Sequence, residues 1–207
     1  MYVRISSART APERLDQAIA AYEAQVVPTH RQQPGYMGTV LEVSRDTGEA
    51  WGITYWESLA ALNASEQESA RIRPTASASA GVSIVDVDRY EMVISEWRAG
   101  GSRSGAAARI NESYAPVEKL EATIAVIREG TPRILEQKGC LGVVMGVNRM
   151  TGRGFAGSIW ETAEDREASE EAVAGTREKA REVAGAQAKV VRPEVVFVEM
   201  KQPTRTG

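Results

Sequence analysis

The chain carries one sequence pattern twice: PTHRQQPGYMGTVLEVSRDTGEAWGITYWES at residues 28–58 and PRILEQKGCLGVVMGVNRMTGRGFAGSIWET at residues 132–162. The two segments align without a gap at a constant shift of 104, and 11 of the 31 aligned positions are identical. The identities include turn glycines and the pairs Trp56/Trp160 and Glu57/Glu161. Because self-similarity at a fixed spacing is the signature of repeated structural units, the sequence predicts two tandem repeats.

The match extends beyond these segments on both sides. Leu15 and Ile19 correspond to Leu120 and Ile124 at a shift of 105, and the tripeptide Ala-Ser-Glu at residues 64–66 recurs at residues 168–170. We therefore predict a first repeat at residues 1–97, a polar linker rich in glycine and serine at residues 98–106, a second repeat at residues 107–201 and a tail at residues 202–207. Each repeat is of domain size.

Local signals give each repeat the order strand, helix, strand, strand, helix, strand. The expected strands are residues 2–6, 39–43, 50–56 and 82–93 in the first repeat, and 107–111, 142–148, 154–160 and 190–200 in the second. A capping box from Thr10 to Glu13 is expected to start the first helix, and Ser58 to cap a second helix that ends near Arg73. The corresponding helices of the second repeat are expected at residues 116–130 and 162–184.

This order predicts an α+β fold of two ferredoxin-like βαββαβ repeats. On the third strand, Thr54 and Trp56 share one face while Ile53 and Tyr55 share the other, because side chains alternate along a strand. Both faces carry bulky apolar groups. We expect the helices of the same repeat to cover one face and the sheet of the other repeat to cover the second, which closes an intramolecular barrel.

Composition excludes several functions. A net charge of -3 with scattered basic residues provides no footprint for nucleic acid, and no run approaches the ~18 apolar residues of a membrane span. The chain enters a strand pattern directly at its first residues, so we expect no leader and a cytoplasmic protein. Cys140 is the single cysteine and His30 the single histidine, which argues against a disulfide and against the usual metal sites. No cofactor fingerprint is present, so we expect neither a metal nor a cofactor.

Two further features point to a family. The third strand of each repeat ends in an aromatic step, Tyr-Trp-Glu-Ser at residues 55–58 and Ile-Trp-Glu-Thr at 159–162, and leads into a helix rich in alanine and glutamate. These steps, and the glycine-containing approaches to the second strand at residues 34–38 and 138–142, resemble the antibiotic biosynthesis monooxygenase-like (ABM) domains of the dimeric α/β-barrel superfamily. The resemblance implies that a barrel usually made by two subunits is here a pseudo-dimer within one chain, and it leaves further homo-oligomerisation open.

The resemblance also implies a function. One branch of the family oxidises polycyclic phenols by letting the deprotonated substrate react with oxygen, without metal or flavin. The first hypothesis is therefore a cofactor-independent monooxygenase-like enzyme that acts on an aromatic or quinol-type small molecule. The alternative is a non-catalytic barrel that binds a small ligand or serves only as a structural element. Haem degradation is poorly supported, because members of that branch place a histidine in the second helix and neither repeat has one there.

The expected catalytic residues are Asn111 and Arg109. Asn111 stands on the first strand of the second repeat, where the resemblance places an asparagine that orients the substrate. Arg109 shares its face, as Arg4 and Ser6 share a face in the first repeat. An arginine beside a small polar group can clamp an anion. The alternative is an ion pair with a glutamate or aspartate at the edge of the barrel or between the two repeats.

The remaining pocket candidates are aromatic. Trp56 and Trp160 are expected to wall the pocket, with packing in the core as the alternative, and Tyr36 is expected to bond a phenolic ligand or to pack within its strand. His30 is interpreted as a solvated residue at the end of the first helix, and it is replaced by Ile134 in the second repeat. Cys140 is interpreted as a small buried thiol.

Overall fold

The structure is a computed structural model, and it describes residues 1–185 and 188–201. The predicted tail at 202–207 lies outside these residues. The chain forms two compact units. The N-terminal unit comprises Met1–Arg89 together with the segment that begins at Val196, and the C-terminal unit comprises Tyr90–Val195. The predicted repeat boundaries remain an interpretation of the sequence pattern.

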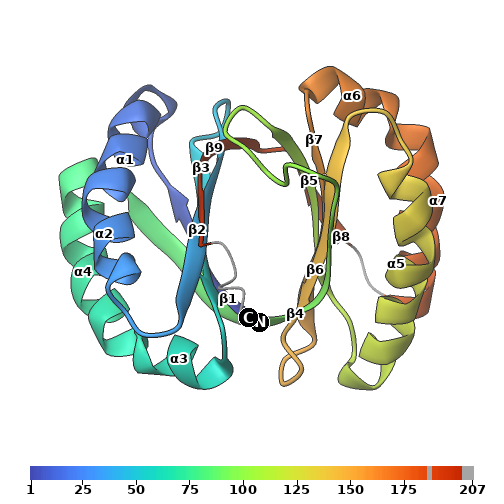
Figure 1. The fold of residues 1–207 in the computed structure, drawn as a ribbon, viewed down its shortest axis with the longest axis horizontal. Coiled ribbons are helices and arrows are strands. Elements are labelled where there is room, and N and C mark those ends of the chain that lie inside the picture. The colour runs from blue at the N-terminus through green and yellow to red at the C-terminus, as the bar shows by residue number, and fades with distance from the viewer. Residues whose placement is uncertain (186–187, 202–207) are drawn as a thin grey trace, which may run out of the picture. The chain divides into compact units, whose positions relative to one another are not determined.

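The N-terminal unit begins with a strand and two helical segments. Its elements are β1 (Tyr2–Arg9), α1 (Leu15–Ala21), α2 (Val27–Arg31), β2 (Tyr36–Ser44), β3 (Glu49–Trp56), α3 (Leu59–Ala64), α4 (Glu66–Ala80) and the first part of β4 (Ser83–Trp97). A π-helical turn, Tyr22–Val26, joins α1 to α2. Figure 1 shows α1, α2 and α4 on one face of the sheet made by β1, β2 and β3.

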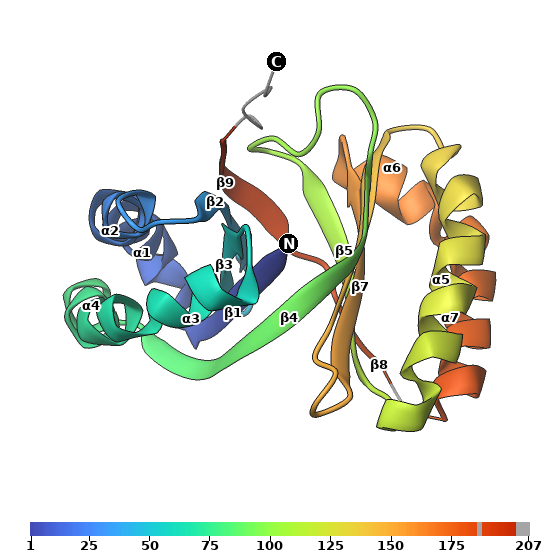
Figure 2. The same ribbon diagram turned by 60° about the horizontal axis from the view of Figure 1, so that its bottom comes forward.

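The C-terminal unit has the same order. Its elements are β5 (Ala107–Tyr114), α5 (Leu120–Leu135), β6 (Cys140–Val147), β7 (Arg153–Trp160), α6 (Ala163–Ala168), α7 (Glu170–Ala184), β8 (Ala188–Val191) and β9 (Glu194–Met200), of which the last crosses into the N-terminal unit. Helices α5 and α7 lie side by side along the sheet, as Figure 2 shows. The predicted α+β class and the two ferredoxin-like repeats are confirmed.

The hydrogen-bonded strand order closes on itself. It runs β7-β6-β4-β1-β3-β2-β9-β5, β5 pairs again with β7, and β8 lies beside β5. The strand pairs whose register is known are antiparallel. The ring of eight strands confirms the closed arrangement, the dimeric-type α/β barrel within one chain, that the sequence predicted.

Strand register places equivalent residues of the two repeats at equivalent points. Arg4 lies opposite Thr54 in the β1–β3 pair, and Arg109 lies opposite Ser158 in the β5–β7 pair. Two residues away in the same strand pairs, Tyr2 lies opposite Trp56 in the first repeat, and Ala107 lies opposite Trp160 in the second. The duplicated sequence therefore builds the same constellation twice.

Each unit has its own apolar core between its helices and its sheet. In the N-terminal unit, Leu15 from α1 packs with Leu41 and Val43 from β2. In the C-terminal unit, a larger cluster joins α5 and α7 to the sheet and includes Ile124, Val173 and Trp160. Within the part of the chain that the structure describes, no helix is long and apolar enough to span a membrane.

The predicted capping box at Thr10 is wrong. A short 3-10 helix, Pro12–Arg14, precedes α1, and its N-cap residue is Ala11. The Thr10 hydroxyl instead donates to the carbonyl oxygen of Gly81 at 3.0 Å. Instead of capping the helix that follows it, Thr10 makes a tertiary hydrogen bond that links the end of β1 to the end of α4. The predicted cap at Ser58 is confirmed, because its side chain accepts a hydrogen bond from the N–H of Ala61 at 3.1 Å.

Several predicted element ends also need correction. Strands β1 and β5 are longer than expected and continue to Arg9 and Tyr114, and β4 continues to Trp97. The second helix of the first repeat continues past its expected end at Arg73 to Ala80. The strand expected at residues 190–200 is two strands, β8 and β9, because Pro193 has no N–H to donate and restricts the residue before it.

Candidate functional site

A buried arginine forms the centre of the first repeat. Arg4 is 2% exposed, and its Nη1 donates to Ser69 Oγ at 2.6 Å. Its Nη2 donates to the carbonyl oxygen of Leu62 at 2.8 Å and to Ser65 Oγ at 3.0 Å, and it lies 2.9 Å from Glu66 Oε2. Burial lowers the pKa of Arg4 to about 10, against the opposing field of Glu66, so the guanidinium stays charged at neutral pH.

The second repeat builds the same arrangement around Arg109, which is fully buried. Its Nη1 donates to Ser169 Oγ at 3.0 Å, its Nη2 donates to the carbonyl oxygen of Arg166, and the same nitrogen lies 3.0 Å from Glu170 Oε2. Both arginines therefore form ion pairs. The acidic partner comes from a helix of the same repeat, so a pair between the two repeats is wrong for both.

These arginines explain why each second helix is broken in two. Leu62 lies in α3, which ends at Ala64, and Arg166 lies in α6, which ends at Ala168. The last carbonyl groups of a helix have no partner inside it, and here a guanidinium supplies one. Consequently Ser65 and Ser169 separate the two helical segments, where the sequence predicted one continuous helix in each repeat.

A tryptophan lies under each guanidinium. The Cζ atom of Arg4 is 5.6 Å from the ring centroid of Trp56, and that of Arg109 is 5.7 Å from the ring of Trp160. Both tryptophans are fully buried. The indole N–H of Trp56 donates to Thr54 Oγ1, at 3.0 Å. Each tryptophan thus holds its arginine by a cation–π contact and is held in turn by a hydroxyl of its own strand.

Glutamate Glu66 connects the buried arginine to the surface. It also pairs with Arg73, and its Oε2 lies 3.0 Å from Nη2 of Arg89. Burial raises the pKa of Glu66, but hydrogen bonds from Arg73 and Arg89 outweigh it and hold the pKa below its usual value. Three arginines therefore surround one carboxylate, which leaves the cluster with net positive charge.

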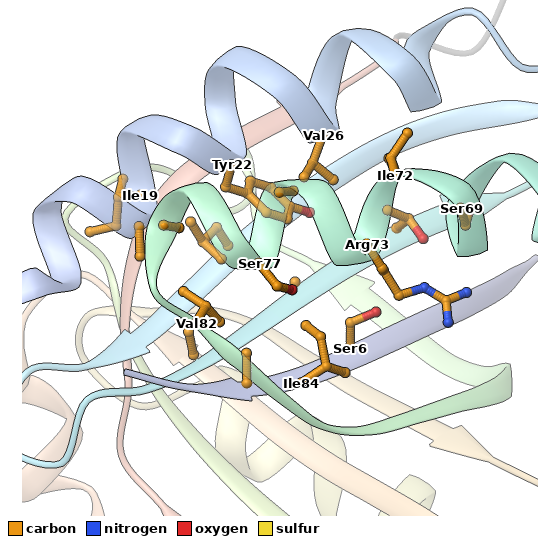
Figure 3. A pocket seen from close by; sticks show the side chains of 18 of the residues that line it. Ser6, Ile19, Tyr22, Val26, Ser69, Ile72, Arg73, Ser77, Val82 and Ile84 are labelled. Carbon is orange, nitrogen blue, oxygen red and sulfur yellow. The ribbon is translucent and has the colours of Figure 1, made fainter. Parts of the chain in front are cut away.

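A cavity of about 100 Å³ lies between the helices and the sheet of the N-terminal unit. Figure 3 shows its labelled side chains: Tyr22, Val26 and Ile19 come from the first helical region, Ser69 to Ser77 from α4, Ser6 from β1, and Val82 and Ile84 from the approach to β4 and its start. A single water needs ~10–15 Å³, so this space admits a small organic molecule. Its lining is mainly apolar, with a few polar groups.

His30 lines this cavity, and it is buried rather than solvated, which corrects its interpretation from the sequence. Its Nε2 lies 3.0 Å from Ser69 Oγ, and its ring packs against Tyr36 and Trp56. Burial, followed by the field of Arg4, lowers the pKa of His30 to about 4. The imidazole is therefore neutral at pH 7, and among the described residues its Nδ1 has no hydrogen-bond partner.

The predicted pocket residues occupy two different layers. Arg4 and Ser6 line the first cavity, whereas Trp56 lies beneath it. The hydroxyl of Tyr36 donates to Glu199 Oε1 at 3.4 Å, so this tyrosine contacts the incoming strand β9.

The predicted catalytic pair is not brought together at one surface. Asn111 lines a second cavity of about 70 Å³ in the C-terminal unit, at the place that Ser6 takes in the first. Its Nδ2 donates to the carbonyl oxygen of Ala156 at 3.2 Å. Arg109 and Trp160 belong to the buried layer beneath that cavity. Cys140 is buried as predicted, and burial raises the pKa of its thiol to about 11.

Sequence reasoning missed the polar groups that come from α4 and α7. Arg73 and Arg177 line the two cavities and are identical at the shift of 104. Glu66 and Glu170 belong to the repeated Ala-Ser-Glu tripeptide. Identity between the repeats was therefore a usable signal for both pairs. No such signal existed for Ser69, since the second repeat has Val173 there.

Comparisons with known proteins find similarity to one family over the first part of the chain. The model of the antibiotic biosynthesis monooxygenase family matches residues 1–71. An uncharacterised protein of Mycobacterium tuberculosis strain H37Rv is 38% identical over 79 residues, which cover 38% of this chain and 35% of that protein. A second uncharacterised protein of the same strain is 34% identical over 89 residues, which cover 42% and 38%. The matches therefore span little more than a third of these curated relatives.

Solved structures extend the likeness to the whole chain. An anthrone oxidase-like protein superposes with a TM-score of 0.72 at 14% identity and covers 96% of this chain and 93% of its own. A heme-degrading enzyme from Listeria monocytogenes has a TM-score of 0.52 at 8% identity and covers 94% and 99%. At these identities the likeness shows the fold alone. Residues 1–71 match the model of the antibiotic biosynthesis monooxygenase family, and the chain forms a dimeric-type α/β barrel.

Proposed function

We propose that the first repeat is a cofactor-independent monooxygenase that binds a phenolic or quinol-type small molecule in its helix–sheet cavity. The observation that carries the proposal is the buried, neutral imidazole of His30, whose Nδ1 has no partner within residues 1–185 and 188–201. It lies on a mainly apolar cavity beside Arg4 and Arg73. An apolar cavity with a few convergent polar groups and a perturbed pKa is typical of a small-molecule site.

His30 would act as the general base. In the proposed tautomer, Nε2–H donates to Ser69 Oγ and the lone pair of Nδ1 takes the substrate's hydroxyl proton. A low pKa alone makes His30 a weak base. However, the guanidinium groups of Arg4 and Arg73 favour the phenolate, and the negative charge of the phenolate raises the pKa of His30 once it forms.

The oxidation then requires an electron-rich anion and dioxygen. A substrate CH₂ group conjugated to the phenolate supplies the four electrons that reduce dioxygen and the two hydrogens that end in water. One oxygen atom enters that carbon as a carbonyl, and the other leaves as water. Anthrone, whose enol form is a phenol, satisfies this balance and gives anthraquinone and water. The fold likeness to an anthrone oxidase-like protein supports the choice of this first substrate.

The test is oxygen uptake by the purified chain with anthrone, with anthraquinone formation followed by absorbance. We expect His30→Asn to lower kcat/KM by ~10²-fold or more, as expected for loss of a general base. The control is Gln32→Ala, an exposed residue two positions away that does not line the cavity, and it should leave the rate unchanged.

The pH profile provides a second readout. Because His30 must be neutral to accept a proton, kcat/KM of the unaltered chain should fall as the pH drops through about 4. Full activity of the folded His30→Asn variant would contradict the proposal. Saturable quenching of tryptophan fluorescence without oxygen uptake would favour the alternative, a small-ligand-binding barrel.

A further inference from the structure

The cavity of the second repeat occupies the same position as the first but has a different chemistry. The positions of His30, Tyr22 and Ser69 hold Ile134, Ile127 and Val173, all of which line the second cavity. Among its described lining residues, the ionisable groups are two arginines. Arginine does not give up its proton at neutral pH, so this cavity can bind a ligand but has no group that moves a proton.

Two buried polar atoms on this cavity lack partners within the part of the chain that the structure describes. They are Oδ1 of Asn111 and Nη1 of Arg177. The amide orientation of Asn111 is determined by its Nδ2, which donates to the carbonyl oxygen of Ala156. Its Oδ1 is therefore an acceptor without a donor. Leaving such an atom buried and unpaired costs ~1–3 kcal/mol, and a ligand that pairs it recovers this free energy.

Arg177 supplies the complementary group. Its Nη2 donates to Glu170 Oε1 at 2.5 Å, which anchors the guanidinium and leaves the N–H groups of Nη1 unpaired. The surroundings are cationic, because Arg109 and Arg192 share the same carboxylate of Glu170 with Arg177. A positive cluster with an unpaired donor nitrogen, on the same cavity as an unpaired acceptor, favours an anion that also carries a donor.

We propose that the second cavity binds a small hydroxy-carboxylic acid without converting it. The carboxylate accepts from Nη1 of Arg177, and the hydroxyl of the ligand donates to Oδ1 of Asn111. The apolar remainder packs against Val143, Met145 and Ile127, which line the same cavity. This inference goes beyond the function proposed above, because it concerns another cavity and predicts binding without turnover.

The experiment is isothermal titration calorimetry of the full chain with salicylate, benzoate and phenol. Salicylate carries both the carboxylate and the neighbouring hydroxyl, benzoate lacks the hydroxyl, and phenol lacks the carboxylate. In the second cavity we expect one salicylate per chain, weaker binding of benzoate and the weakest binding of phenol. Any binding of these phenols in the first cavity is removed by Ala76→Leu, which fills that cavity. Equal affinity for phenol and salicylate, or no heat with any of them, would overturn the proposal.

Variants locate the ligand. Asn111→Ala should weaken salicylate about tenfold while leaving benzoate unchanged, because only salicylate donates to the amide oxygen. Arg177→Gln should weaken both acids by ~10-fold or more. The matched variants of the first repeat, Ser6→Ala and Arg73→Gln, should leave salicylate binding unchanged. A loss that follows Arg73 rather than Arg177 would place the acid in the other cavity and refute the proposal.

A second pair of variants covers the case in which Arg177→Gln fails to fold. Ala180 lines the second cavity and Ala76 lines the first, at equivalent positions. Ala180→Leu should fill the second cavity and abolish salicylate binding, whereas Ala76→Leu should not affect it. Oxygen uptake with anthrone tests the first cavity separately, so the two proposals can fail independently.

Discussion

Arg4 and Arg109 are buried cations, and removing each from water costs free energy that only close partners offset. Each is compensated by one carboxylate, by serine hydroxyls and helix-end carbonyls, and by the face of a tryptophan. Strand parity in the sequence placed both arginines beside a small polar residue. It could not show which charged residue of a distant helix would pair with them, because that depends on helix packing.

Glu42 is a buried acidic residue on the face of the sheet opposite to that of Arg4. It lies on β2, opposite Trp51 of β3, and is 4% exposed. Burial raises the pKa of this carboxyl from 4.5 to about 7. Folding therefore favours the protonated form of Glu42, which contributes stability that is fully present below pH 4.5 and is lost as the pH rises through 7.

Replacing Glu42 with glutamine should remove this pH dependence. The difference in unfolding free energy between Glu42→Gln and the unaltered chain should rise by ~3 kcal/mol from pH 4.5 to pH 7, since one pKa unit corresponds to about 1.4 kcal/mol. Urea unfolding at a series of pH values measures it. Glu23→Gln, at an exposed position, is the control for the loss of one acidic side chain. A constant difference for Glu42→Gln would contradict the assignment.

Among the elements, the order of strands and helices could be predicted from the sequence, but several ends could not. The order follows from local periodicity and turn residues, and both patterns occur in each of the two repeats. The ends of α3 and α6 depend instead on a guanidinium from a different strand, and the cap expected at Thr10 was lost to the carbonyl of Gly81. Pro193 did carry a local signal for the break between β8 and β9.

Gly38 shows how one element accommodates another. It has φ +155°, and a Cβ atom there would overlap with the backbone of β9 at Glu199 and Met200. In the second repeat, a Cβ at Gly142 would overlap with the ring of Trp97 from β4. The absence of a side chain at these two equivalent glycines leaves room for the neighbouring strand, which is β9 beside β2 and β4 beside β6.

A side chain at position 38 should therefore push β2 and β9 apart. We expect Gly38→Ala to lower the unfolding free energy by ~2 kcal/mol, because overpacking and an unfavourable φ both oppose the native backbone. Thermal unfolding measures the effect. The control is Gly175→Ala in α7, where a Cβ meets nothing within 4 Å, and this change should stabilise the chain by ~0.5–1 kcal/mol. A neutral Gly38→Ala would show that β9 can shift without cost.

At the scale of the whole molecule, the two compact units do not coincide with the two sequence repeats. Strand β4 continues from the N-terminal unit into the C-terminal unit, where it pairs with β6, and β9 returns to the N-terminal unit beside β2. Arg31 and Tyr36 both contact Glu199 on β9. Sequence comparison of the repeats could not reveal this exchange, because aligned copies carry no information on which unit a terminal strand joins.

Removing β9 should affect the unit at the other end of the sequence. In a chain that ends at Val195, backbone amides of β2 should exchange with deuterium faster, because β2 becomes an edge strand, while β6 should keep its protection. Hydrogen-exchange mass spectrometry resolves the two strands. A chain that ends at Lys201 is the control and should match the full chain. Unchanged exchange in β2 of the chain that ends at Val195 would contradict the pairing of β2 with β9.

The return of β9 also has a consequence for biosynthesis. The contacts of Glu199 with Arg31 and Tyr36 bridge 168 and 163 positions of the chain. A ribosome adds ~5–20 residues per second, so the first unit waits roughly ten seconds or more for its last strand. During that interval the outer side of β2 is an open template for foreign strands. Vectorial synthesis therefore makes this nascent edge the natural point of contact for a chaperone and the first place where the chain would aggregate.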